Sequence, residues 1–357
     1  ALQHVSGYNK TERVPPADVI RELIRHRASV NKPSYQGETA LYTTVSMRNQ
    51  ELTKIILNAG GSVNSILGVN VLYALSRGCE LMPHNDEALA EAEGIIQLVK
   101  DKLKVREKGI EGSTILHFAA SSCNTQFIDV LGEVFELDIR ASDRYGRNIL
   151  HHAVRNKEIY FFTDDALKSR AFRKALGATD KDDNTPLHLA CLEQNTTAID
   201  KLLELGADPN VVGKMGLRPL HLCAQPLWID TPYCFIWSED KYQSEAGHRK
   251  ALQAMAQVIN YKADVTAVDK YGNTVLHFVA FAGCSSSAID LLLGSKGMDS
   301  NFRDRNGFTA GEVAAKQCHW ETAVLLGAHD FRSKIPQSDC GPGRSTINAL
   351  DSYTNSA

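Results

Sequence analysis

Residues 180–210 read DKDDNTPLHLACLEQNTTAIDKLLELGADPN, and this stretch contains the signals of one small helical unit. Its Asp- and Asn-rich start favours a tight turn, because these side chains bond to nearby backbone amides. Thr185 is a predicted helix N-cap and Pro186 a first helical residue, where the missing N–H of proline costs nothing. A second helix follows and ends at Gly206, which accepts the left-handed conformation. The apolar residues of this helix are spaced to lie on one face: Ile199, Leu202 and Leu203.

A short phrase ending in histidine returns along the chain, as in Thr185-Pro-Leu-His188. The intervals between successive copies are 34, 37, 33 and 56 residues. A recurrence near every 33 residues predicts one small unit stacked along an axis. Such a stack offers a long exposed face and rarely carries a reaction centre, so binding is the expected activity. The histidines are His117, His151, His188, His221 and His277.

The apolar triplet of the second helix also repeats, and a single helix pair cannot bury such a stripe alone. Neighbouring units must therefore cover it. The other triplets are Ile20/Leu23/Ile24, Leu52/Ile55/Ile56, Ile95/Leu98/Val99, Phe127/Val130/Leu131, Phe172/Ala175/Leu176, Met255/Val258/Ile259 and Ile289/Leu292/Leu293.

On these phrases the chain resembles the ankyrin-repeat family, over about residues 16–330. Gly272-Asn-Thr-Val-Leu-His277 and the connection Gly206-Ala-Asp-Pro-Asn210 are typical matches. The resemblance implies an all-α ankyrin-repeat solenoid of helix-turn-helix units with β-hairpin fingers, whose concave side usually binds protein. It also implies that each histidine is a polar lock, bonded to the Thr of its own unit and to neighbouring backbone. Asp183 stands where the family has Gly, so the resemblance predicts a strained or altered turn there.

The repeat pattern predicts three segments. Residues 1–34 form an N-terminal segment and a partial capping repeat, and residues 35–330 form an array of about eight units. Residues 331–357 are rich in Ser, Gly, Asn and Pro and are predicted to be a flexible tail. Insertions are predicted near 76–92, 159–166 and 225–250.

Composition narrows the class of protein further. The net charge of −3 over 357 residues gives no bulk attraction to nucleic acid or to an anionic membrane. No apolar run approaches the roughly 20 residues of a membrane helix, and residues 1–10 show no secretory signal. The eight cysteines form no C-x-x-C pair, which favours reduced, packed thiols and a cytoplasmic or nuclear location. We also expect a monomer. The start at Ala1 without methionine suggests a fragment or a processed chain.

The histidines invite a metal or catalytic hypothesis, but each occupies the same slot of a different unit. Zinc needs ligands about 2 Å from one point, which a row spaced by helix pairs cannot supply. No phosphate-binding, dinucleotide, hydrolase or metalloprotease motif occurs in the sequence. We therefore predict no catalytic residue, no metal and no cofactor.

The predicted finger tips carry basic and aromatic residues outside the packed stripes. Tyr and Arg dominate the binding energy of many protein interfaces, which favours contact with a partner. A merely solvated face is the alternative, because Asp143, Asp180, Asp182, Asp269 and Asp304 are interleaved with the cations. The partner-binding candidates at the tips are Arg144, Tyr145, Arg147, Lys181, Lys270, Tyr271 and Arg305.

The insertion at 225–250 is a second candidate surface, since two of the three tryptophans of the chain lie in it. Its aromatic candidates are Trp228, Tyr233 and Trp237. Such a segment either folds over a neighbouring unit or presents aromatics to a partner, and the sequence favours neither.

Four functions compete. A non-catalytic scaffold that binds protein through the fingers and the concave helix face fits best, and a regulatory ankyrin arm of a larger channel or enzyme is the alternative. An enzyme is disfavoured because no convergent set of polar groups is visible. A small-ligand receptor would need a pocket, for which only the aromatic insertion offers a lining.

Overall fold

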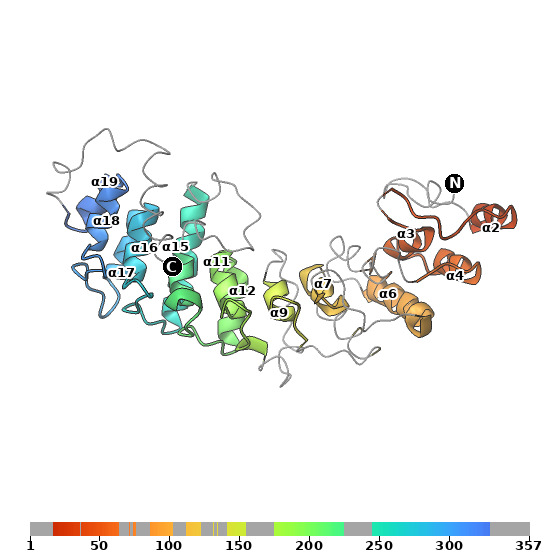
Figure 1. Ribbon diagram of the computed structural model, residues 1–357, viewed down its shortest axis with the longest axis horizontal. Coiled ribbons are helices and arrows are strands. Elements are labelled where there is room, and N and C mark those ends of the chain that lie inside the picture. The colour runs from red at the N-terminus through yellow and green to blue at the C-terminus, as the bar shows by residue number, and fades with distance from the viewer. Residues whose placement is uncertain are drawn as a thin grey trace. The chain divides into compact units, whose positions relative to one another are not determined.

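The structure is a computed structural model, shown in Figure 1, and its chain divides into two compact units, Ala1–Lys181 and Asp182–Ala357. The units are considered one at a time. The residues that the structure describes are 17–35, 37–63, 71, 74–75, 86–102, 112–122, 131, 134, 141–154, 175–224 and 245–328.

The first unit contains short helices that pack as successive neighbours. Within it α2 and α3 both pack on α4, α4 packs on α6, and α7 packs on α9. The helix bounds are α2 (Ala17–Arg25), α3 (Ala40–Ser46), α4 (Gln50–Asn58), α6 (Asp86–Val99), the 3-10 turn η2 (Lys100–Lys102), α7 (Ile115–Ser122) and α9 (Ile149–Ala153).

The second unit is a row of helix pairs, α11 with α12, α13 with α15, α16 with α17 and α18 with α19 (Figure 1). The first helices of successive pairs pack on one another, and so do the second helices. This confirms the predicted all-α stack. The helix bounds are α11 (Pro186–Leu192), α12 (Thr196–Glu204), η5 (Lys214–Gly216), α13 (Pro219–Cys223), α15 (Glu245–Asn260), α16 (Val275–Ala282), α17 (Ser286–Leu293), α18 (Ala310–Lys316) and α19 (Trp320–Leu325).

Burial of the α12 stripe shows why each pair needs its neighbours. Ile199, Leu202 and Leu203 are all buried, and α12 contacts both its partner α11 and the next second helix, α15. Apolar burial of this kind contributes about 1.5–3 kcal/mol for each large side chain. Leu293 of α17 is an exception among the predicted stripe residues, since 39% of its surface is exposed.

Several details differ from the sequence-based predictions. Helices α6 and α15 begin inside the insertions predicted at 76–92 and 225–250, so both insertions end earlier than expected. Among the described residues the fingers contain only isolated antiparallel bridges, Val268 with Thr274 and Arg303 with Thr309.

The insertion at 159–166 and the tail 331–357 lie outside the described residues. No helix in the described ranges has the length and apolarity that a membrane span requires.

The prediction of reduced, packed thiols is confirmed for three of the described cysteines and wrong for a fourth. Cys191, Cys223 and Cys284 are free and buried. Cys318, in contrast, is disulfide-bonded.

The recurrent histidine joins its own unit to the next, which confirms the predicted polar lock. The Thr185 N–H donates to His188 Nδ1 over 3.1 Å, so this nitrogen is an acceptor and the ring proton lies on Nε2. The Nε2–H donates to the Leu217 carbonyl, 3.3 Å away in the following unit. Three other histidines bond in the same way to the carbonyl of a following unit: His117 to Arg147, His221 to Ala267 and His277 to Phe308.

These imidazoles are held in their neutral form. Burial lowers the pKa of His117 and of His188 to about 4, against 6.5 for an ordinary histidine. Burial lowers the pKa of His221 and His277 as well. A proton on Nδ1 would remove the acceptor that the Thr N–H requires, so protonation breaks the lock.

We expect the protein to lose stability between pH 6.5 and pH 4. The folded-state pKa of His188 lies below its unfolded value, so its contribution is complete above pH 6.5 and is lost as the pH falls toward 4. The loss for a fully buried imidazole is on the order of 3 kcal/mol. Urea unfolding at stepped pH measures it.

The His188→Gln variant should show a weaker dependence of unfolding free energy on pH than the unmodified chain. His26→Gln is the matched control, because the His26 side chain is exposed. A flat unfolding free energy across this window would contradict the role of the buried histidines.

Candidate partner-binding surface

Three finger tips are organised by a buried aspartate that accepts backbone N–H groups. In the first unit, Asp143 Oδ1 accepts from the amides of Tyr145 (2.8 Å) and Arg147 (2.9 Å). In the second unit, Asp269 and Asp304 bond in the same way to the amides two and four residues later, at 2.8–2.9 Å. This is the Asx-turn chemistry expected from the sequence, and it gives these three tips the same hydrogen-bond pattern.

Successive tips are joined by a ladder of backbone hydrogen bonds. In the second unit, the Lys270 N–H donates to the Met215 carbonyl (2.8 Å) and the Arg305 N–H to the Tyr271 carbonyl (2.9 Å). In the first unit, the Lys181 N–H donates to the Tyr145 carbonyl (2.8 Å). One basic residue per finger is therefore held at a fixed step along the row of tips.

Glycine is required where two tips approach. Gly272 has a φ of 81°, and a Cβ there would lie 3.0 Å from the amide nitrogen of Arg305. Asp183 takes the same left-handed conformation, with a φ of 59°, at the position where the other fingers have glycine. The strained turn that the family resemblance implied at Asp183 is thus confirmed.

The tips separate their acids from their bases. Asp143, Asp180, Asp269 and Asp304 are buried, whereas Arg144, Lys181, Lys270 and Arg305 are exposed. The interleaved acids therefore do not form the solvated mixed-charge face that the sequence left open. Asp182 is half-buried and pairs with Lys214 over 2.6 Å.

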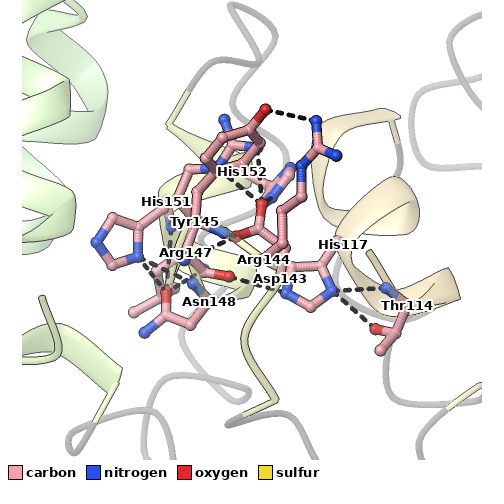
Figure 2. A network of polar contacts seen from close by, with 10 residues as sticks. Thr114, His117, Asp143, Arg144, Tyr145, Arg147, Asn148, His151 and His152 are labelled. Atoms are coloured by element: carbon pink, nitrogen blue, oxygen red, sulfur yellow. Dashed lines mark hydrogen bonds and ion pairs between the residues drawn. The ribbon is translucent and has the colours of Figure 1, made fainter. Parts of the chain in front are cut away.

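Figure 2 shows the polar network around Asp143 in the first unit. Asp143 Oδ2 accepts from Arg147 (2.7 Å) and from His152 Nε2 (3.0 Å). Burial by itself would raise the pKa of this carboxyl, but the hydrogen bonds from His152 and Arg147 outweigh it and hold the pKa well below its usual range. Asp143 is therefore an anion at neutral pH, and Arg147 is its counter-ion.

The prediction that Arg147 contacts a partner is wrong. Its side chain is 8% exposed and forms a buried ion pair with Asp143, so it is not accessible from outside. Sequence reasoning placed it at a finger tip because it lies outside the packed apolar stripes. The chain has already turned back into the unit at that point.

Tyr145 and Tyr271 are half-buried and lie beside cations, whereas the sequence predicted exposed anchors at these positions. The guanidinium carbons of Arg144 and Arg147 lie 4.8 Å and 4.6 Å from the centre of the Tyr145 ring, and Arg144 donates to its hydroxyl (2.7 Å). In the second unit, Lys270 Nζ lies 4.8 Å from the centre of the Tyr271 ring. Cation–π contacts of this kind hold a cation over the face of the ring.

Exposed apolar residues beside the tips were missed by sequence reasoning. Val212 and Val268 are 55% and 42% exposed, and each lies two residues before a tip lysine. Phe302 of the next finger is 40% exposed. The repeated spacing between a valine and a tip lysine was the available signal, and it was not recognised.

The aromatic candidates Trp228, Tyr233 and Trp237 lie outside the described residues, so their role stays a prediction. Within the described part of the chain there is no group of three or more His, Cys, Asp or Glu side chains that could hold a metal ion.

Comparisons with known proteins agree with this geometry. Residues 182–214 match the family model for the ankyrin repeat. The chain is 30% identical over 148 residues to a Caenorhabditis elegans protein named transient receptor potential cation channel subfamily A member 1 homolog, covering 41% of this chain and 12% of that relative. It is 30% identical over 172 residues to human SH3 and multiple ankyrin repeat domains protein 2, covering 44% and 9%.

A putative ankyrin repeat protein of fowlpox virus is 24% identical over 266 residues, which is 62% of this chain and 45% of that relative. The chain therefore matches less than half the length of each of these relatives.

We expect Gly272→Ala to destabilise the second unit more than Gly307→Ala. Both glycines have a positive φ, but a Cβ at Gly307 meets nothing within 4 Å. Gly307→Ala should cost about 1 kcal/mol from backbone strain, and Gly272→Ala about 2 kcal/mol or more because the tip-to-tip hydrogen bond is also displaced. Chemical denaturation of both variants measures the difference, and equal costs would argue against the close approach of the tips.

Arg144 and Arg147 should respond differently to replacement by alanine. Arg147→Ala leaves the buried Asp143 charge without its strongest partner and should cost about 3 kcal/mol. Arg144→Ala removes an exposed guanidinium and should change stability by less than about 0.5 kcal/mol. The two variants replace the same residue type three positions apart. Their thermal unfolding therefore compares the stability cost of losing the buried ion pair with the cost of losing an exposed side chain.

Proposed function

We propose that this chain, an ankyrin-repeat protein, is a non-catalytic scaffold that binds another protein through its finger tips and the first helices beside them. Ankyrin repeats mediate protein–protein interaction, and the relatives that share them include a channel homolog and a multidomain protein by name. The proposal concerns the tip residues of each unit, which are Arg144, Tyr145 and Lys181 in the first unit and Lys270, Tyr271 and Arg305 in the second.

The observation that carries the proposal is the fixed position of two half-exposed tyrosines. The carbonyls of Tyr145 and Tyr271 are both held by the tip ladder, and both rings lie against cations. A rigid aromatic with an exposed edge loses little conformational entropy on binding, and central Tyr and Arg residues dominate many interfaces. No comparable arrangement is needed for the packing of the helices.

We further propose that the scaffold is monomeric, acts in the cytoplasm or nucleus, binds neither nucleic acid nor the membrane interior, and has no catalytic activity of its own. The free buried thiols of Cys191, Cys223 and Cys284 support this location, whereas the disulfide at Cys318 weighs against it. Support for the absence of catalytic activity comes from the role of the histidines, since His117, His188, His221 and His277 are all engaged in packing.

A second candidate is a regulatory arm of a larger channel or enzyme. The similarity to a segment making up 12% of a channel homolog favours it. Sequencing of the full-length transcript separates the two candidates, because a channel or catalytic domain on the same chain would establish the arm.

Replacement of both tip tyrosines should weaken partner capture without unfolding the protein. In affinity capture from native lysate, Tyr145→Ala with Tyr271→Ala should reduce recovery of the partner at least about tenfold, as expected for interface hot spots. Tyr261→Ala is the matched control, because Tyr261 is 40% exposed and lies at the end of α15, away from the tips.

Melting temperatures of the three proteins establish that all are folded. Unchanged capture by the double variant, together with loss of capture by Trp237→Ala, would move the binding face to the aromatic insertion.

A further inference from the structure

The same three-residue arrangement occurs in both units. A tip cation precedes a tyrosine, and the tyrosine carbonyl accepts the N–H of the next finger's tip cation. In the second unit these residues are Lys270, Tyr271 and Arg305, and in the first unit they are Arg144, Tyr145 and Lys181. We call each set a tyrosine clamp.

The cations of the second-unit clamp are not neutralised by the chain itself. Within the described residues, neither the Lys270 ammonium nor the Arg305 guanidinium forms an ion pair or a hydrogen bond. Other exposed cations nearby are paired: Lys214 with Asp182, Arg218 with Asp264, and Arg303 with Glu312. The clamp therefore offers two cations, on adjacent fingers, to an anion from outside.

We propose that the tyrosine clamp of the second unit binds an acidic segment of a partner protein, with one carboxylate at each cation and an intervening residue against the tyrosine ring. This proposal rests on the scaffold function proposed above and names the chemistry of its partner. Arginine presents a planar fork that suits bidentate carboxylate binding, whereas lysine acts as a point charge. Tyr271 supplies apolar surface between them.

The step between fingers sets the spacing of the carboxylates. Packed helices lie about 8–10 Å apart, which is the distance that one repeat advances along the row. A polyproline II segment rises about 3.1 Å per residue with three residues per turn, so residues i and i+3 face the same side about 9 Å apart. The ligand is therefore an extended segment with acidic residues at every third position, a conformation common in chains that are unfolded on their own.

The buried aspartates favour discrete carboxylates over a polyanion. Asp269 and Asp304 each lie directly before a clamp cation and are buried beneath the tip. Their negative charge weakens the attraction of Lys270 and Arg305 for a distant anion. It weakens the attraction less for a carboxylate in direct contact with either cation, because Coulomb attraction is strongest at short distance. Nucleic acid binding depends on many phosphate contacts at once, which two such clamp cations do not supply.

The test uses the full chain and a fluorescently labelled synthetic peptide with glutamate at every third position, separated by alanine and proline. Peptide controls carry glutamine at the same positions, or glutamate at every fourth position. One peptide should bind each chain, at the second-unit clamp, and added salt should weaken its binding because exposed charges are screened.

Charge reversal at the clamp should remove the site. Lys270→Glu with Arg305→Glu should weaken peptide binding at least about tenfold, since each change removes an attractive pair and creates a repulsive one. Lys250→Glu with Lys296→Glu is the matched control, because both lysines are exposed and lie away from the tips and the net charge changes equally.

Three results would overturn the proposal: equal binding of the glutamine peptide, equal loss in the Lys250 and Lys296 control, or tighter binding of a single-stranded RNA of similar length. Failure of the clamp proposal is distinguishable from failure of the scaffold proposal. If the Lys270→Glu and Arg305→Glu reversals leave native partner capture intact while the Tyr145 and Tyr271 variant loses it, the scaffold stands and the acidic ligand does not. If neither set affects capture, both fail.

Discussion

Each unit of this protein depends on the following one for a hydrogen-bond acceptor as well as for apolar cover. The imidazole of His188 donates to the Leu217 carbonyl of the next unit, and the α12 stripe is covered in part by α15. A lone helix pair would expose its apolar face to water and would leave the imidazole N–H without its carbonyl acceptor. The stability of each unit therefore depends on its contacts with adjacent units. The interior residues that make these contacts repeat, whereas the tip residues can vary.

The same dependence organises the surface. Because the Arg305 amide must reach the Tyr271 carbonyl, the tip is forced close to the preceding finger, and Gly272 provides the space. The turn aspartates satisfy the tip amides and become buried in doing so. The cations that follow them have no such role and point outward. Charge separation at the tips is thus a consequence of satisfying backbone hydrogen bonds.

Rigidity at the tips has a functional value for binding. Tyr145 and Tyr271 are positioned by backbone bonds and by neighbouring cations before any partner arrives. A surface prepared in this way loses less entropy on association than one made of mobile side chains. In the first unit, His117 and the Asp143–Arg147 pair are buried, so the residues that hold the structure differ from those proposed to contact a partner.

The sequence by itself determined the repeat period and the helical units, and its resemblance to the ankyrin-repeat family implied the histidine lock and the place of the tips. The period and the helices are local or periodic features, so a turn signal, an N-cap or an apolar spacing suffices to find them. Only the tertiary structure decided that Arg147 is buried while Arg144 is exposed, that the turn aspartates lie inside, and that Val212 and Val268 lie outside. Those outcomes depend on where a neighbouring finger lies against each side chain, and residue type and spacing do not encode that position.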